Sequence, residues 1–240
     1  MRLTLILAGL SVVGCALAQP VTVTGNVTIE RKDAARNAKS DWSNAVVWLK
    51  PAAGSNIVLP RAANQPKYEI RQTHKRFEPH ILAVPMGSTI WFPNLDPFFH
   101  NVFSLYEGNR FDLGLYEAGA THSTRFDRPG ICFIFCNIHP EMSGVVITLN
   151  TPFYAMVHGQ GPIEIANVPF GRYQLHVWSE GNGPENTQPP GQELTIAESS
   201  PKVVVVRVPA INRQNLAHKN KYGRDYDPPT PDSPIYHQQP

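Results

Sequence analysis

Short runs in which apolar and polar residues alternate recur along the chain between residues 21 and 209. A period of two places every second side chain on one face of an extended strand, and Gly, Asn, Asp and Pro residues separate the runs as turns do. No stretch carries apolar residues convincingly at helical spacing. The pattern predicts strands at residues 21–24, 45–49, 89–92, 121–126, 131–136, 154–157, 163–165, 173–178 and 202–208.

Many short strands with regular turn signals between them are typical of all-β sandwiches, which is the fold class predicted here. The polar stretch 31–43 divides the first two runs, and residues 112–119 are expected to form a long surface connection. A chain of 240 residues has room for one or two domains of about 100–200 residues each.

The first 18 residues are interpreted as a secretory signal peptide. An apolar run over residues 3–14 follows Arg2, and small residues precede a cleavage site after Ala18. The run is shorter than the ~20 residues that span a bilayer, so the mature chain is expected to be periplasmic or secreted, with no transmembrane span. Residues 12–15 also resemble a lipoprotein box with a lipid anchor at Cys15, but a strand begins almost at once, which favours simple cleavage.

The last 31 positions, 210–240, lose apolar periodicity, and residues 227–234 are rich in proline. Such composition predicts a disordered tail. The charge of the whole chain is nearly balanced, with 21 Lys and Arg against 19 Asp and Glu. This balance argues against a nucleic acid as partner.

Four residues form a candidate metal site. Cys136, His139 and Met142 follow one another at two-residue gaps after an apolar strand, and His100 stands 36 residues before Cys136 at the start of another strand. A thiolate and two imidazoles with a weak axial thioether are the ligands of blue-copper electron-transfer sites. Structural zinc sites prefer paired Cys and His ligands and seldom use Met.

The other Cys, Met and His residues are interpreted as ordinary side chains. On a strand, the Cα atoms of Cys132 and Cys136 would lie about 13 Å apart, beyond the ~7 Å that a disulfide allows. A binuclear copper centre with both cysteines would need a loop between them, so Cys132 is expected to be a core thiol. Met86 is a conceivable substitute for Met142, but it lies outside the motif. The remaining histidines lack partners at ligand spacing: His74, His80, His122, His158, His176, His218 and His237.

Residues 68–149 resemble the cupredoxin family, and the ligand loop Cys-Asn-Ile-His-Pro-Glu-Met is most similar to the loop of amicyanins. The resemblance implies a Greek-key β-sandwich that holds one type 1 copper and exchanges single electrons with a redox partner protein. Carried over by position, His100, Cys136 and His139 become equatorial ligands and Met142 the axial ligand. Asn101 then corresponds to the residue whose amide ties the two ligand loops together. A role in methylamine oxidation would follow only from the amicyanin-like loop.

Four apolar residues flank the expected ligands: Phe98, Phe99, Ile138 and Pro140. They have either a packing role in the loops or a functional role as a docking patch around an exposed edge of His139. A patch of this kind suits a small, weak redox interface below ~1,200 Å².

Residues 168–177 resemble the carboxypeptidase regulatory-like (transthyretin-like) sandwich, in which a Pro-x-Gly turn precedes Tyr-x-Leu-x-Val. The acidic turn of that module is missing here. The segment after residue 150 also lacks the first two strands of the module, for which residues 23–27 and 45–49 are candidates. We therefore expect the cupredoxin domain, 66–150, to be inserted into a discontinuous sandwich of residues 21–65 and 151–209. Pairing of 45–49 with 173–178 would distinguish this arrangement from a simple tandem.

An electron carrier, and not an enzyme by itself, is the leading functional hypothesis. Copper nitrite reductases and multicopper oxidases resemble cupredoxins in fold, but they need a second copper centre and usually more domains. Two alternative hypotheses stay open. In one the chain is a subunit of a copper oxidoreductase, and in the other it is a copper-storage or adhesive module in which the second sandwich binds a partner.

Overall fold

Strands account for all the regular structure in the computed structural model, which describes residues 19–30, 44–59, 66–105, 109–158, 161–179, 191–198, 203–209 and 219–226. The expected signal peptide with Cys15, the polar stretch 31–43 and most of the C-terminal tail lie outside the described residues. Within the described ranges the fold is all-β, and no helix there is long and apolar enough to cross a membrane.

The seventeen strands of the described residues include every strand that the alternating runs predict. They are β1 (Val21–Glu30), β2 (Asn44–Pro51), β3 (Tyr68–Glu69), β4 (Arg71–Thr73), β5 (Arg76–Glu78), β6 (Ile81–Pro85), β7 (Ser88–Pro93), β8 (His100–Ser104), β9 (Phe111–Tyr116), β10 (Thr121–Phe126), β11 (Gly130–Phe135), β12 (Ser143–Leu149), β13 (Tyr154–His158), β14 (Gly161–Val168), β15 (Gly171–Ser179), β16 (Gln192–Ile196) and β17 (Val203–Pro209).

The expectation of a surface connection at 112–119 is wrong, because most of this segment belongs to strand β9, paired with β8. The register of the pair shifts between Asn101 and Phe103, and Gly114 has a left-handed φ of 73°. A bulge of this kind breaks the alternation of apolar and polar residues. Strand β9 therefore leaves no period-two signature in the sequence.

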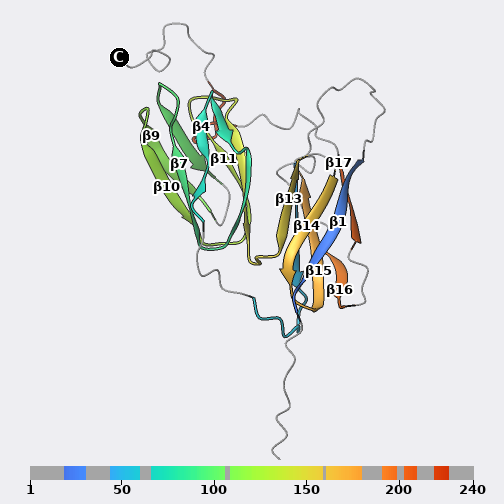
Figure 1. Ribbon diagram of the computed structural model, residues 1–240. Coiled ribbons are helices and arrows are strands. Elements are labelled where there is room, and N and C mark those ends of the chain that lie inside the picture. Colours follow the sequence, from blue (N-terminus) through green and yellow to red (C-terminus); the bar gives the residue numbers. More distant parts are fainter. Residues whose placement is uncertain are drawn as a thin grey trace, which may run out of the picture.

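Two sheets form a sandwich that we call the ligand sandwich, residues 68–149. One sheet has the strand order β10-β7-β3 and the other β6-β12-β11-β8-β9. The two sheets share a core whose largest buried members are aromatic: Phe77, Phe92, Tyr116 and Phe126. In Figure 1 this body carries the part of the chain that runs from cyan through green to yellow.

Two further sheets form a second body, the split sandwich, from segments on either side of the ligand sandwich in the sequence. Their strand orders are β14-β1-β17 and β13-β2-β15-β16. The expected pairing of 45–49 with 173–178 is confirmed, since β2 and β15 are antiparallel with Leu49 opposite Leu175 and Val47 opposite Val177. The Pro-x-Gly turn expected before β15 joins it to β14, and the Tyr173 hydroxyl donates to the Pro169 carbonyl at 2.8 Å.

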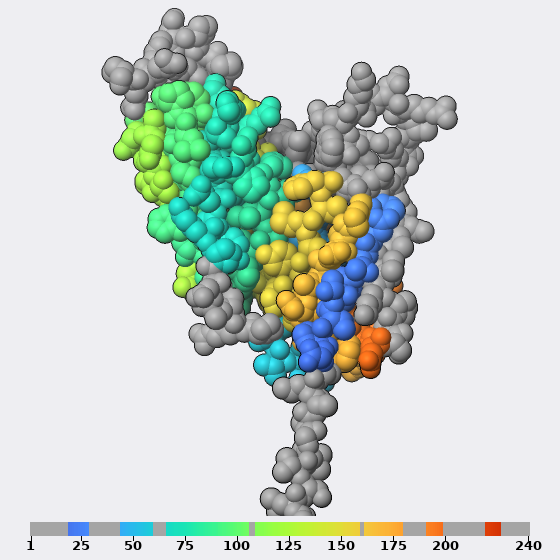
Figure 2. Space-filling view, in the orientation of Figure 1, coloured from blue at the N-terminus to red at the C-terminus, as the bar shows by residue number. Residues whose placement is uncertain are grey.

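The two sandwiches pack face to face through a third apolar cluster, and they lie side by side in Figures 1 and 2. Strand β2 is buried on both faces: Val47 and Leu49 point into the split sandwich, while Val46 and Trp48 meet the other body. Strand β12 contributes from the opposite side with Val145, Ile147 and Leu149. Continuous apolar runs such as Ala-Val-Val-Trp-Leu are expected for strands without a solvent face.

Candidate metal centre

Neighbouring strands of one sheet position the expected ligands. His100 is the first residue of β8, and Cys136 directly follows β11, which pairs with β8 through Phe135 and Phe103. The loop from Cys136 to Met142 closes on itself, because the Cys136 N–H donates to the Met142 carbonyl at 3.2 Å and the Met142 N–H to the His139 carbonyl at 3.0 Å. A short, internally bonded loop on a rigid sheet holds its side chains in place.

Three candidate ligand atoms converge. The Nδ1 atoms of His100 and His139 lie 3.1 Å apart, and Sγ of Cys136 lies 3.9 Å from the first and 3.6 Å from the second. A metal about 2.0–2.1 Å from each nitrogen and about 2.3 Å from the sulfur would separate such atoms by roughly 3.2–3.8 Å. All three side chains are buried, and the described part of the chain holds no other group of three such ligands. The three residues therefore fit a single metal ion.

Met142 and Met86 differ in their surroundings. Met142 is fully buried in the same apolar cluster as Cys136. Met86 is 47% exposed, in the turn between β6 and β7. Of the two thioethers, only that of Met142 belongs to the ligand loop.

Asp96 fixes the orientation of His100, a role that the sequence analysis missed. Its Oδ2 atom lies 2.8 Å from Nε2 of His100, the ring nitrogen that faces away from Cys136. The same carboxylate accepts the backbone N–H groups of His74 at 2.7 Å and Lys75 at 2.9 Å. Carboxylates on the outer nitrogen of a histidine fix its tautomer and its ring plane for metal binding.

Asn101 joins the two ligand segments, as the resemblance implies. Its Oδ1 atom accepts the backbone N–H of Asn137 at 3.3 Å. Its Nδ2 atom donates to Asp112 Oδ1 at 2.7 Å and to the Gly114 carbonyl at 2.8 Å. The bulge of β9 thus supplies the acceptors that hold the amide of Asn101 beside Cys136.

Burial sets the protonation of the candidate ligands in the metal-free protein. It raises the pKa of the Cys136 thiol, while backbone N–H groups of Ile138, Asn101 and His139 act in the opposite direction by bonding to the thiolate. Burial also lowers the pKa of His139 to about 4, with smaller contributions from His100 and Lys75. Burial lowers the pKa of His100 as well, so both imidazoles are held neutral, the form in which histidine binds metals.

His139 is only 1% exposed, so the expectation of an exposed His139 edge is wrong. The ring of Phe98 lies 5.6 Å from the His139 ring and 5.2 Å from the His100 ring, and it covers both. Lys75 in turn places its Nζ atom 5.5 Å from the centre of Phe98. Of the expected docking residues, Phe98, Phe99 and Ile138 are half-buried and Pro140 is exposed.

Cys132 lies apart from this group, in the core of the ligand sandwich. Its Sγ atom donates to Ser104 Oγ at 3.2 Å, and burial raises its pKa to about 11. Neither Cys132 nor Cys136 is in a disulfide, as expected. A buried thiol bonded to a serine behaves as a small core residue.

Residues 219–226 belong to the tail expected to be disordered, yet they pack beside the ligand loop. The Tyr226 hydroxyl donates to the Cys136 carbonyl at 2.7 Å, and the Lys221 N–H donates to Asn137 Oδ1 at 3.0 Å. Lys221 also forms a 2.7 Å ion pair with Asp112. These partners lie far upstream in the sequence, so the low apolar content of the tail gave no sign of them.

No protein-family profile matches the sequence, and no curated protein matches it. Solved structures with partial similarity include a purple cupredoxin from Nitrosopumilus maritimus, at 22% identity over 35% of this chain and 100% of that one, with a TM-score of 0.32. A reduced amicyanin mutant has 22% identity over 35% and 82%, with a TM-score of 0.33. A copper-containing nitrite reductase from Thermus scotoductus has 20% identity over 51% and 28%, with a TM-score of 0.34.

Proposed function

We propose that the chain is an exported carrier of single electrons that binds one copper. His100 and His139 would supply their Nδ1 atoms, Cys136 its thiolate and Met142 a weaker thioether. The observation that carries the proposal is the convergence of the three buried ligand atoms, with distances of 3.1, 3.6 and 3.9 Å between them. Two imidazoles, a thiolate and a thioether are the donors typical of blue copper.

The bound metal would supply a Cu(I)/Cu(II) couple that takes up and releases one electron. The residues of the chain keep the donor atoms in one arrangement: Asp96 holds His100, Asn101 holds the start of the loop, and the loop is bonded to itself. The buried position of all three donors excludes water. A carrier needs such a site because little rearrangement can then accompany electron transfer.

Substitution of the two cysteines tests the copper site. The wild-type protein reconstituted with Cu(II) is expected to show an intense blue or green colour and a narrow copper hyperfine splitting. Cys136→Ala should abolish both, and Cys132→Ala should retain both, because Cys132 bonds to Ser104 outside the ligand group. Loss of the colour in the Cys132 variant alone would favour a binuclear centre instead.

We further propose that a redox partner docks over Phe98, Phe99, Ile138 and Pro140, where the ring of Phe98 covers His139. Of these four residues Pro140 is exposed, and Leu95, which precedes the segment in the sequence, is 57% exposed. Ile138 packs against the core, so Pro140 is the better residue to alter.

The variant Pro140→Glu should slow electron exchange with the partner and leave the copper spectrum unchanged. Val58→Glu is the control, because Val58 is 86% exposed and lies outside the ligand sandwich. Equal rates for both variants and the wild type would remove the patch from the mechanism.

A further inference from the structure

The described part of the tail, residues 219–226, is an ordered turn that we call the C-terminal brace. Asn220 organises it, because its Oδ1 atom accepts the backbone N–H groups of Tyr222 and Arg224, each at 3.0 Å. The Asn220 N–H donates to the Arg224 carbonyl at 2.9 Å, and Gly223 supplies the left-handed residue of the turn with a φ of 74°. The brace therefore has a shape of its own when it meets the ligand sandwich.

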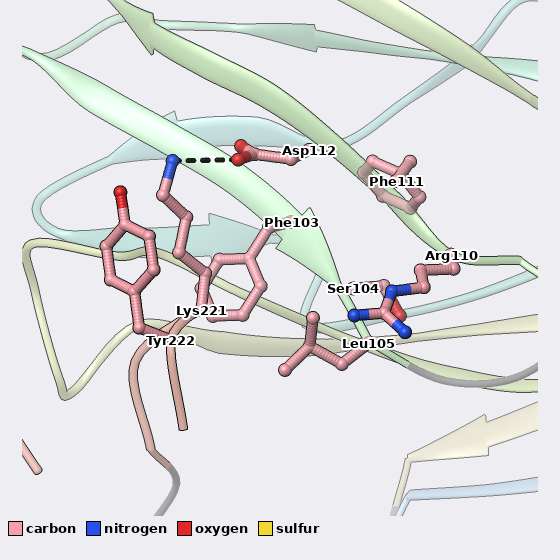
Figure 3. A pocket seen from close by; sticks show the side chains of 8 residues that line it. All are labelled: Phe103, Ser104, Leu105, Arg110, Phe111, Asp112, Lys221 and Tyr222. Atoms are coloured by element: carbon pink, nitrogen blue, oxygen red, sulfur yellow. Dashed lines mark hydrogen bonds and ion pairs between the residues drawn. The ribbon is translucent and has the colours of Figure 1, made fainter. Parts of the chain in front are cut away.

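Lys221 closes a ring of contacts around Asn101. Its backbone N–H donates to the side chain of Asn137, whose backbone N–H donates to Asn101. Asn101 donates to Asp112 Oδ1, and the ammonium group of Lys221 donates to Asp112 Oδ2, which completes the ring. Figure 3 shows this last contact, with Lys221 and Asp112 facing each other at one end of a pocket of about 340 Å³.

The opposite charges of Asp112 and Lys221 stabilise this ring of contacts. Burial raises the pKa of Asp112, but the hydrogen bonds from Lys221, Asn101 and Gly114 outweigh that effect and leave the pKa below its usual value. The Asp112 carboxylate consequently stays charged opposite the Lys221 ammonium. Half-buried ion pairs of this kind are less screened by salt than fully exposed ones.

Tyr226 makes the second contact with the ligand loop. Its hydroxyl donates to the carbonyl oxygen of Cys136, the residue that offers the thiolate. The brace thus holds the Cys136–Asn137 peptide from one side while Asn101 holds it from the other.

We propose that the C-terminal brace is a built part of the copper site, in which Lys221 and Tyr226 are positioning residues for Cys136 and Asn101. The inference rests on the proposed function and adds a component from outside the ligand sandwich. Tyr226 holds the carbonyl of Cys136, and the Lys221 N–H holds the side chain of Asn137, so the start of the ligand loop is fixed on its backbone. The brace therefore slows the release of copper, because the loop has to move for the metal to leave.

Two conservative variants test the proposal in the full chain. Tyr226→Phe removes only the hydroxyl, and Lys221→Met removes the ammonium while it keeps the backbone N–H. Arg224→Met is the matched control from the same turn, since Arg224 is exposed.

The measurements are copper release to a chelator and, without copper, amide hydrogen exchange of the ligand loop. Loss of one hydrogen bond should speed copper release by about three- to tenfold in Tyr226→Phe. Both test variants should show faster exchange at Asn137 and Met142, and the control should match the wild type.

Test variants that match the wild type and the control in both measurements would overturn the proposal. If the wild type itself shows no blue-copper spectrum, the proposed function fails, and the copper-free exchange experiment still decides whether the brace holds the loop. Unchanged exchange in the copper-free variants would overturn the brace on its own.

Discussion

Asp96 connects His100 to a part of the chain that contributes no ligand. Its carboxylate is held by two backbone N–H groups in the turn between β4 and β5, where His74 and Lys75 have φ values of 53° and 54°. These hydrogen bonds help to hold the pKa of Asp96 below its usual value, although burial raises it. The ring of His100 therefore meets a carboxylate that stays charged and fixed.

Substitution of Asp96 by Asn should weaken copper binding by about 10- to 100-fold, which is the usual effect of losing such a partner of a ligating histidine. The amide keeps the size of the side chain but loses the charge that orients His100. Competition with a chelator of known affinity measures the change.

The control for this prediction is Asp127→Asn, because the Asp127 side chain is 62% exposed and pairs with Arg125 on the surface. Equal affinities of the two variants would show that the charge of Asp96 does not support His100.

The convergence of His100, Cys136 and His139 could be predicted from the sequence, since the residues of the loop stand at fixed gaps and their donor chemistry points to one metal. Asp96, Lys221 and Tyr226 could not be predicted, because a single polar residue has no periodic signature and its partner is set by the tertiary fold. The burial of His139 was missed for the same reason. It depends on Phe98, which the fold brings over the ring.

At the scale of strands, alternation marked β1, β2, β7, β10, β11, β13, β14, β15 and β17. It missed β9, where the bulge at Gly114 shifts the register, the short strands β3 to β5, and the regularly paired strands β6, β12 and β16. Strand β2 shows a further limit. Its apolar run predicts a buried strand, but the sequence cannot tell that Val46 and Trp48 contact a different body from Val47 and Leu49.

Strand β15 carries a pH-sensitive residue at the contact between the two bodies. His176 stacks on Trp48, with ring centroids 5.4 Å apart, and Gly191 lies against its Nε2 atom, where an added Cβ would come within 2.9 Å. Burial lowers the pKa of His176, and the charge of Lys50 adds to this effect.

A lowered pKa in the folded state means that the unfolded chain binds the proton more readily. The contribution of His176 to stability is therefore complete above about pH 6.5, which is the pKa of histidine in the unfolded chain. As the pH falls below this value, the unfolded chain takes up the proton first and this contribution is lost. We expect His176→Phe, which keeps the aromatic stack, to lose less stability than the wild type between pH 7 and 5. Urea unfolding at a series of pH values measures this. Parallel curves for the two proteins would contradict the assignment.

At the scale of the whole molecule, we propose that residues 21–65 and 151–209 form one discontinuous domain and residues 66–150 a domain inserted into it. The pairing of β2 with β15 and the separate apolar cores support this division. The shared cluster around Trp178 couples the two bodies. Chain termini that lie close together make such insertions tolerable.

The coupling predicts that Ile147→Ala lowers stability by about 2–5 kcal/mol, because Ile147 is 1% exposed within the shared cluster. The variant should also unfold in two separated calorimetric transitions, since weaker contact lets each sandwich unfold on its own. Val58→Ala, at a residue that is 86% exposed, should unfold as the wild type does. A single transition in Ile147→Ala at the wild-type temperature would contradict the coupling.

The most direct test of the central claim is a reductive titration of the copper-reconstituted protein, with the copper content and the X-ray absorption of the metal measured on the same sample. The account predicts one copper per chain, bleaching of the colour by one electron per chain, and a metal bound by one short sulfur and two nitrogen ligands. Two coppers per chain, or a single copper without a sulfur ligand, would contradict it.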